Sequence, residues 1–125
     1  MRHWLLLLLP LVLLAGCAAP ELSLNANHAN GRVEVRKNQP FIISLEGNPT
    51  TGFAWEVSAL DERLLRQSAA PEFTPQNDRI GAGGIQTFHF RAIERGETQL
   101  TLVYRRPWET GAPPAQTYAV TIVVR

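Results

Sequence analysis

The fold class is decided by the stretch Thr117-Tyr118-Ala119-Val120-Thr121-Ile122-Val123-Val124, near the C-terminus. Every second residue from Tyr118 to Val124 is large and apolar, while Thr117 and Thr121 lie on the opposite face. Successive side chains of a β-strand point to opposite faces of a sheet, so this period of two predicts a strand with one buried face. Such a strand needs a second layer against which its apolar face packs.

The same period of two recurs upstream. Apolar side chains alternate with other residues at Val33 and Val35, at Phe41, Ile43 and Leu45, at Phe53, Trp55 and Val57, at Phe88, Phe90 and Ala92, and at Leu100, Leu102 and Tyr104. Turn residues separate these segments, and long helical patterns are lacking. We therefore predict an all-β domain, an immunoglobulin-like antiparallel β-sandwich of about seven strands. Trp55, on the third expected strand, is predicted to lie in its core.

Two segments depart from this pattern. Leucines at helical spacing predict one helical turn over Leu60–Gln67. Residues 68–80 carry two prolines and few apolar side chains, so any strand there is expected to be irregular or at a sheet edge. His89 lies on the polar face of its strand, and we expect it to be exposed rather than to bind a metal.

The composition limits the classes of function. The chain has 125 residues and a formal net charge of +1 at pH 7, so one small domain is expected, without the basic surplus of a nucleic-acid-binding protein. The single cysteine excludes an internal disulfide and a cysteine-based zinc cluster. The sequence also lacks a serine, histidine and acid arrangement and a phosphate-binding glycine loop before a helix. We therefore expect a monomer without enzyme activity, cofactor or metal.

The N-terminus resembles the leader of bacterial lipoproteins. Residues 1–16 combine Arg2, an apolar run that contains Pro10, and small residues before Cys17. A transmembrane anchor is the alternative, but the apolar run is shorter than the roughly 20 residues that span a bilayer. The resemblance implies that residues 1–16 are a signal peptide and that Cys17 becomes the lipidated first residue. Its thiol is then not available for catalysis.

The lipoprotein leader implies export and attachment to a membrane through Cys17. Ala18 differs from the aspartate that typically retains such lipoproteins in the inner membrane, so we expect the outer membrane, facing the periplasm. Residues 17–31 are mostly polar and unpatterned, and we predict that they form a flexible tether. The folded domain is then expected to comprise residues 32–125.

Three loops contain conformationally restricted residues. The first, Asn48-Pro49-Thr50-Thr51-Gly52-Phe53, combines the fixed φ of proline, a glycine that favours positive φ and an asparagine that can cap a turn. The others are Gly81-Ala82-Gly83-Gly84 and Arg106-Pro107-Trp108. If successive strands alternate in direction, every second connection lies at the same end of the sandwich. The three loops are therefore predicted to meet at one end.

Each loop has a structural and a binding interpretation. Residues 48–52 form either a tight turn or a rigid tip with two hydroxyls. Residues 81–84 form either a flexible hairpin connection or a backbone that pairs with a partner. Trp108 either folds back on the domain or acts as an exposed anchor in an interface. The residues alone leave these alternatives open.

The three loops together, in this order and with Trp55 after the first, resemble the chagasin family of cysteine-protease inhibitors, the I42 inhibitor family. The family pattern is NPTTG followed by an aromatic residue, then GxGG, then RPW, and this sequence matches each motif. The resemblance covers about residues 32–125 and leaves the leader outside. It implies an immunoglobulin-like fold and reversible inhibition of papain-like cysteine proteases.

The resemblance also implies a binding site. The three loops would form a wedge in the active-site cleft of the protease, with Thr50 and Thr51 over the catalytic centre. The backbone of Gly83 and Gly84 would pair along the cleft, while Trp108 would pack on an apolar wall. One alternative from another class stays open, namely a non-inhibitory immunoglobulin-like envelope lipoprotein that binds a protein or a glycan through the same loops.

Overall fold

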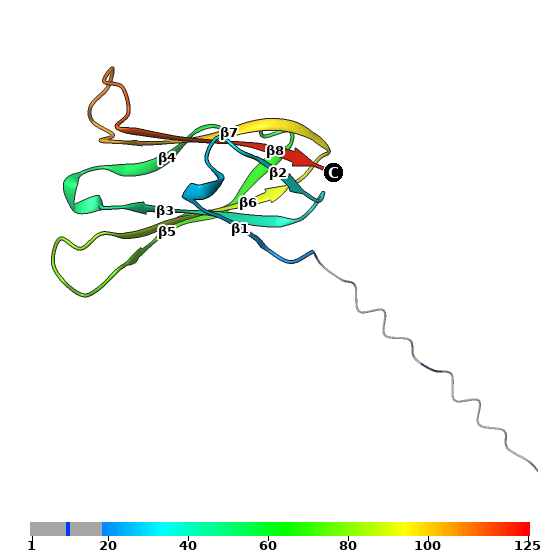
Figure 1. The fold of residues 1–125 in the computed structure, drawn as a ribbon, viewed down its shortest axis with the longest axis horizontal. Helices are drawn as coiled ribbons and strands as arrows, with labels where there is room; N and C mark the ends of the chain where they lie inside the picture. Colours follow the sequence, from blue (N-terminus) through cyan, green and yellow to red (C-terminus); the bar gives the residue numbers. More distant parts are fainter. Residues whose placement is uncertain (1–9, 11–18) are drawn as a thin grey trace, which may run out of the picture.

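The computed structural model describes residue 10 and residues 19–125, whose strands form two four-stranded sheets (Figure 1). The strands are β1 (Leu22–Leu24), β2 (Arg32–Val35), β3 (Pro40–Gly47), β4 (Ala54–Ala59), β5 (Leu65–Pro75), β6 (Gly84–Ala92), β7 (Gly96–Arg105) and β8 (Gln116–Val124). Two 3₁₀ turns are η1 (Ala26–His28) and η2 (Pro49–Thr51). Neither helix in this part of the chain is long and apolar enough to cross a membrane. Cys17 and the predicted signal peptide, apart from Pro10, lie outside the described residues.

The two sheets confirm the predicted β-sandwich. One sheet has the order β1-β3-β6-β5 and the other the order β2-β8-β7-β4. The long pairs are antiparallel, since β3 pairs with β6 and β7 pairs with β8 along almost their whole lengths. The two N-terminal strands differ from the expectation because β1 pairs with β3 and β2 with β8 in parallel. The sheets are therefore mixed, with eight strands rather than about seven.

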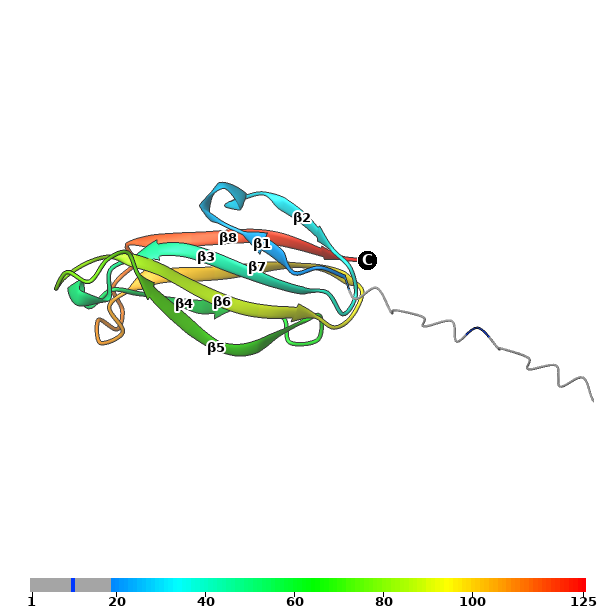
Figure 2. The ribbon, with the colours of Figure 1, turned by 90° about the horizontal axis from the view of Figure 1, so that it is seen from below.

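Residues 22–31 differ from the flexible tether that the sequence predicts. Leu22–Leu24 form β1, and the Leu24 side chain is only 1% exposed. In η1, the backbone amide of Asn25 donates a hydrogen bond to Nδ1 of His28, at 3.1 Å. The chain then crosses from one sheet to the other and enters β2 (Figure 2). The burial of Leu24 favours strand formation over the free motion of a tether, so the folded domain begins before residue 32.

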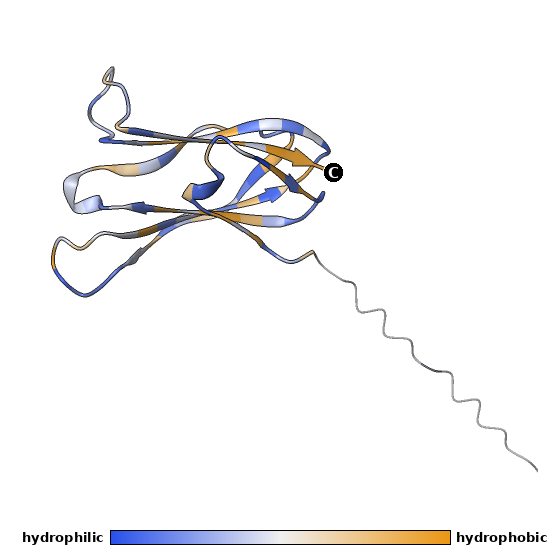
Figure 3. Ribbon diagram, viewed as in Figure 1, coloured by the Kyte–Doolittle hydropathy of each residue, from blue (hydrophilic) through white to orange (hydrophobic). Residues whose placement is uncertain are grey.

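The hydrophobic core lies between the inner faces of the two sheets. The largest fully buried side chains are Phe41, Phe88, Phe90, Leu24, Ile43, Leu65, Leu100, Leu102, Ile122, Val35 and Val120. The rings of Phe41 and Phe90 stack at a centroid distance of 5.2 Å. Trp55 is 7% exposed, which confirms its predicted place in the core. Figure 3 shows the apolar carboxyl end of β8, the strand whose alternation indicates the fold class.

The segment before β5 forms a tight turn rather than a turn of helix. The backbone amide of Leu65 does donate to the carbonyl of Asp61, at 2.9 Å, but Leu65 already begins the strand. The Arg63 guanidinium donates to the Asp61 carboxylate at 3.0 Å, and this hydrogen bond lowers the pKa of Asp61. The turn is therefore held by side-chain contacts that a helical spacing of leucines does not reveal.

β5 (Leu65–Pro75) is irregular and lies at a sheet edge, as the sequence predicts for this part of residues 68–80, whereas residues 76–80 belong to the connection that follows. β5 pairs only with β6, and its register shifts twice, between Gln67 and Ala69 and between Ala69 and Glu72. His89 on β6 is less exposed than expected, with 24% side-chain exposure, and its Nε2 lies 3.5 Å from the Glu72 carboxylate. Prolines and register shifts of this kind discourage pairing of an edge with another chain.

The buried phenol of Tyr118 leads us to expect a loss of stability at high pH. Burial raises the pKa of its phenol to about 12, and the hydroxyl donates to the carbonyl of Asn25 at 3.0 Å. The unfolded chain releases this proton near pH 10, whereas the folded protein holds it to about pH 12. The free energy of unfolding should therefore fall as pH rises through this window, and Tyr118→Phe should flatten the fall. Urea unfolding of the parent and of Tyr118→Phe at a series of pH values measures the free energy of unfolding. If this free energy falls equally steeply with pH in both proteins, the prediction is contradicted.

Candidate functional site

The structure brings the three predicted loops together at one end of the sandwich. Residues 48–53 connect β3 to β4, residues 76–83 connect β5 to β6, and residues 106–115 connect β7 to β8. Figure 1 shows the three connections at one end, and the C-terminus and the start of the described N-terminal segment at the other. The predicted meeting of the loops is therefore observed in the fold, whereas their binding of a partner stays a prediction.

Asn48 holds the first loop and joins it to the second. Its side-chain oxygen accepts hydrogen bonds from the amide of Thr50, at 3.1 Å, and from the Thr50 hydroxyl, at 2.6 Å. Its side-chain nitrogen donates to the carbonyl of Gly81, at 3.1 Å. The Thr51 hydroxyl donates to the carbonyl of Asn48, at 2.6 Å. Both threonine hydroxyls therefore give their protons within the loop, and their exposed oxygens retain lone pairs for a donor from outside.

Gly52 ends η2 in the left-handed region that the sequence predicts. Its φ is 82°, and its amide donates to the carbonyl of Pro49 at 3.0 Å. A side chain at this position would also collide with Trp108, because an ideal Cβ would lie 2.3 Å from Cη2 of the indole. Glycine is therefore required here both by the backbone conformation and by the close approach of the tryptophan.

Trp108 combines features of both interpretations offered by the sequence. The edge of its indole lies against Gly52, which joins the third loop to the first. The residue is nevertheless 67% exposed. Contact with Gly52 limits the motion of the ring, and the exposure leaves most of its surface available to a partner. A partly immobilised, exposed Trp loses little conformational entropy on binding.

Arg106 forms a second bridge between the first and third loops. Its Nε donates to the carbonyl of Thr51, at 3.2 Å, and its Nη1 donates to the carboxylate of Glu109, at 3.2 Å. The guanidinium carbon lies 4.5 Å from the centroid of the Phe53 ring, in a cation–π contact. These contacts hold the arginine within the loop cluster and occupy part of its donor capacity.

Aromatic residues connect the loop end to the core. The ring centroids of Phe53 and Tyr104 are 5.3 Å apart, and those of Tyr104 and Trp55 are 5.1 Å apart. The amide of Asn48 donates to the Tyr104 hydroxyl at 3.0 Å, and the Trp55 indole donates to the carbonyl of Glu46 at 2.8 Å. Residues on one sheet thus satisfy backbone groups at the end of β3 on the other. The loop cluster is therefore supported from both sheets.

Tyr104 and Glu109 are site residues that the sequence analysis missed. The period of two places Tyr104 on an inner face, so it predicts burial and gives no sign that the hydroxyl reaches the first loop. One available signal is its position two residues before the Arg-Pro-Trp motif, since an inward side chain at that point lies near the loop end. Glu109 is an exposed acid in a polar loop, so no sequence pattern marks it, and only its contact with Arg106 identifies it as part of the site.

The glycines of the second loop serve the fold more than expected. Gly84 belongs to β6, and an ideal Cβ there would lie 2.2 Å from the carbonyl oxygen of Thr74 on β5. Gly81 has a φ of 82°, with open space around an ideal Cβ. Ile80, beside it, is fully exposed at the tip. The glycine at 84 is thus explained by strand pairing, while the segment around Ile80 is available for contact.

An open groove lies at the loop end, beside the first and second loops. It has a volume of about 660 Å³ and is lined by residues that include Gly47, Asn48, Gln76, Gly83 and Tyr104. Across the described part of the chain, histidines, cysteines and acids form no group of three that could hold a metal ion. Besides its charged side chains, this end offers backbone groups, threonine oxygens and the exposed apolar side chains of Ile80 and Trp108.

Tyr104→Phe tests the support of the first loop from the opposite sheet. The change removes the hydroxyl that accepts from the amide of Asn48 and retains the aromatic stacking. An unsatisfied amide costs about 1 kcal/mol or more, so exchange of the Asn48 amide proton should become roughly fivefold faster. Tyr118→Phe is the matched control, because that hydroxyl bonds to the carbonyl of Asn25 instead. Unchanged exchange at Asn48 in Tyr104→Phe would contradict the assigned role.

Comparisons with known proteins agree on one family. The profile described as "Chagasin family peptidase inhibitor I42" matches residues 34–122. Amoebiasin-1 of Entamoeba histolytica is 32% identical over 104 residues, which cover 82% of this chain and 97% of that protein. Chagasin of Trypanosoma cruzi is 29% identical over 97 residues, which cover 74% of this chain and 88% of that protein.

A solved structure supports the same fold. The crystal structure of the cysteine protease inhibitor EhICP2 from Entamoeba histolytica matches with a TM-score of 0.75 at 23% identity, over 84% of this chain and 96% of that one. The family profile spans all three loops, together with most of both sheets. The chain therefore belongs to the chagasin family of peptidase inhibitors, I42.

Proposed function

We propose that this protein occludes the active-site cleft of papain-like cysteine proteases with the three loops at one end of its sandwich. Membership of the family makes the chain a reversible cysteine-protease inhibitor and not an enzyme. The observation that carries the finer proposal is the mutual attachment of the loops. Asn48 bonds to Gly81, and Arg106 bonds to Thr51, so the three loops form one preorganised surface. Preorganisation reduces the ordering cost of binding.

The chemistry of the first loop suits the polar centre of such a protease. A papain-like enzyme keeps a thiolate and an imidazolium in its cleft. Thr50 and Thr51 are exposed and donate their hydroxyl protons to Asn48, which leaves their oxygens as acceptors for an imidazolium N–H. The loop would thus approach the catalytic pair without supplying a competing acid or base.

The conformation of the first loop also explains resistance to cleavage. Proteases of this kind act on a carbonyl group that an extended peptide presents to the nucleophile. Residues 49–51 form a 3₁₀ turn, and Gly52 follows with a φ of 82°, so the loop is not extended there. The internal hydrogen bonds of Asn48 oppose the rearrangement that attack would require. Binding without turnover follows from these restraints.

An inhibition assay tests the proposed function directly. The mature chain, starting at residue 17 and carrying Cys17→Ser so that it stays unlipidated, would be titrated against papain and several cathepsin-L-like enzymes. We expect reversible inhibition that competes with substrate, and loss of complex formation after the protease thiol is alkylated with a bulky reagent. Failure to inhibit any of these enzymes at micromolar concentration would overturn the proposal. Binding that persists after alkylation would favour the non-inhibitory binding module instead.

The leader supports a second, separate proposal about location. Residues 1–17 resemble a lipoprotein signal that ends at Cys17, and Ala18 follows. We propose that the mature chain is anchored by lipid at Cys17 to the outer membrane and faces the periplasm. Mass spectrometry of the N-terminal peptide from the membrane fraction tests it, and Cys17→Ser should move the chain to the soluble fraction. An unmodified Cys17 in the membrane-associated protein would overturn it.

A further inference from the structure

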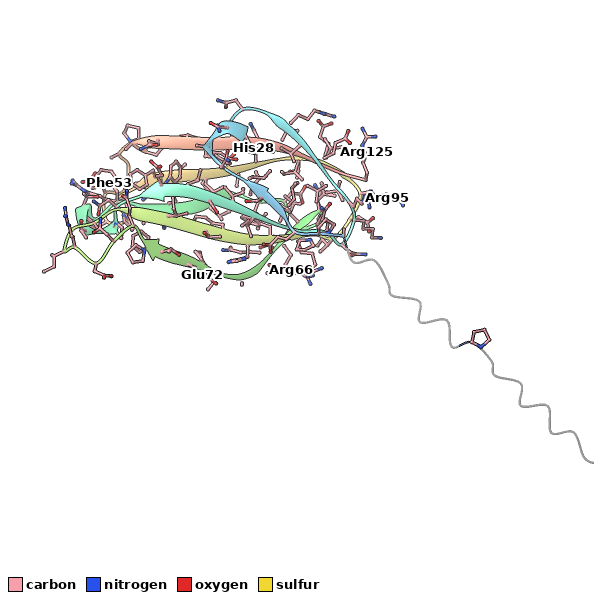
Figure 4. The ribbon with its side chains drawn as sticks, turned by 60° about the horizontal axis from the view of Figure 1, so that its bottom comes forward. His28, Phe53, Arg66, Glu72, Arg95 and Arg125 are labelled. Carbon is pink, nitrogen blue, oxygen red and sulfur yellow. The ribbon has the colours of Figure 1, made fainter. Side chains whose placement is uncertain are left out.

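The end of the sandwich opposite the loops carries arginines without carboxylate partners. In the region that the structure describes, Lys37 pairs with Glu94, Arg63 with Asp61, and Arg125 with Glu34. No such pair involves the following arginines at the same end: Arg36, Arg66, Arg91 and Arg95. These four residues, here called the basal arginines, lie in or next to the connections that face the N-terminal segment. Figure 4 shows Arg95 and Arg125 at this end and Phe53 at the other.

Two of the basal arginines face one another across strands. Arg66 on β5 and Arg91 on β6 are direct partners in the antiparallel register. Like charges in directly opposite positions destabilise a sheet unless a counter-charge lies near them. Arg91 donates to the carbonyl of Asn38, at 2.7 Å, which orients its guanidinium without neutralising it. The pair therefore indicates a place where an external anion would lower the electrostatic energy of the fold.

The two ends of the sandwich differ in charge, with an excess of arginines at the base and an excess of acids at the loop end. Among the described residues, the basal arginines outnumber the acids near them that form no ion pair, which are Glu21 and Glu62. At the loop end, Glu46 and Asp78 carry no ion pair within the described range, and Arg79 is the cation left beside them. The domain is thus positive at its base relative to its loops. Near an anionic surface, this distribution favours one orientation.

The connection to Cys17 is too short for the domain to turn freely. Gln39 donates to the carbonyl of Pro20, at 2.8 Å, so the chain is already tied to the domain three residues after Cys17. At roughly 3.5 Å per residue, that stretch spans about 10 Å at most. A lipid on Cys17 would therefore hold the base of the sandwich within about a Debye length of the headgroups.

We propose that the basal arginines rest on the phosphates of an anionic phospholipid surface, with the three loops directed away from it. The proposal rests on the anchoring proposed above for its location, while contact between arginines and phosphates is a separate property of the domain. A guanidinium binds phosphate oxygens through two parallel hydrogen bonds, which suits a layer of headgroups. The orientation leaves the inhibitory end accessible to a soluble protease.

Vesicle binding of the unlipidated Cys17→Ser chain tests the contact without relying on the anchor. The probes are vesicles of phosphatidylglycerol and phosphatidylcholine in equal parts, and of phosphatidylcholine alone. We expect at least tenfold stronger binding to the anionic vesicles, falling strongly at about 1 M salt, where the Debye length is ~3 Å. Replacement of all four basal arginines by glutamine should remove the difference. Equal binding to both vesicles, or unchanged binding of the variant, would overturn the proposal.

Two further variants keep the test decisive. The first is the double variant Arg36→Gln with Arg95→Gln. Within the described chain, the guanidinium groups of these two connection residues make no hydrogen bond, since only their backbone amides donate. The double variant should therefore stay folded even if the fourfold variant is unstable. It should lose at least threefold in binding to anionic vesicles. Arg79→Gln removes an unpaired arginine at the loop end and should bind as the parent does. The variants of the basal arginines, which lie at the end opposite the loops, should inhibit papain as the parent does in solution. Failure of the membrane contact and failure of inhibition are therefore separate outcomes.

Discussion

Gly52→Ala is expected to raise the inhibition constant against papain by roughly a hundredfold, about 3 kcal/mol. Two effects combine. The left-handed backbone, at a φ of 82°, disfavours a residue with a Cβ, and that Cβ would lie 2.3 Å from Cη2 of Trp108. The free variant should relax by moving the loop and the indole apart. Binding must then restore the original arrangement, so the cost appears in the affinity.

Gly111→Ala is the matched control for Gly52→Ala. Gly111 lies in the third loop with a φ of 87°, and nothing lies within 4 Å of its ideal Cβ. The Gly111→Ala substitution imposes similar backbone strain without displacing Trp108. The inhibition constant of this variant should therefore change far less than that of Gly52→Ala. Inhibition constants of both variants would be compared by competition with a fluorogenic substrate. Equal effects of the two substitutions would show that the contact between Gly52 and Trp108 does not matter for inhibition.

Trp108→Ala is expected to weaken inhibition by about 2 kcal/mol or more, at least thirtyfold. The indole is 67% exposed at the loop end and is held against Gly52, as an interface anchor would be. Because so little of it is buried in the free domain, the melting temperature should hardly change. A calorimetric scan and an inhibition titration on the same preparation separate the two properties.

Trp108→Phe and Ile80→Ala refine the second prediction. Phenylalanine keeps an aromatic surface and should recover part of the affinity lost in Trp108→Ala. Ile80 is fully exposed on the second loop, without the kind of contact that holds Trp108 against Gly52, so removal of its side chain should cost less affinity. A lowered melting temperature with unchanged inhibition in Trp108→Ala would assign the tryptophan to the stability of the domain instead.

The core of this domain follows from local pattern. Tyr118, Val120, Ile122 and Val124 are predicted to share a buried face, and all four are at most 4% exposed. A period of two is a property of the strand itself, so it is visible without knowledge of the partner strand. The same holds for Trp55, whose predicted burial is confirmed.

The first strand, β1, does not follow from local pattern. β1 has only three residues, Leu22–Leu24, which is too short for an alternation to stand out among polar neighbours. Its pairing with β3 in parallel depends on a partner distant in sequence. The absence of a local signal therefore made residues 22–31 resemble a tether. Burial of Leu24 in the finished core is what decides their structure.

In the candidate site, too, some features follow from the local sequence and others depend on the tertiary fold. The residue types of the first loop predict its turn, because proline, asparagine and glycine act on their own backbone, and η2 with Gly52 confirms this. Contacts between loops, such as Asn48 to Gly81, depend on how the sheets place their ends. Tyr104 was predicted only as a core residue, since alternation reports the face of a side chain and not the group its hydroxyl meets.

The pairing of β1 with β3 has a mechanical consequence. β1 is the first strand after the segment that leads from Cys17, and β3 runs straight to Asn48 at the loop end. A pull between a membrane anchor and a bound protease would therefore pass along two adjacent strands, nearly parallel to their axes. Their hydrogen bonds lie across that direction, so they would share the load at once in shear instead of opening one after another. If Cys17 is lipidated as proposed, the shortest strand of the sandwich, β1, would thus be the first strand to carry load between the anchor and the inhibitory loop.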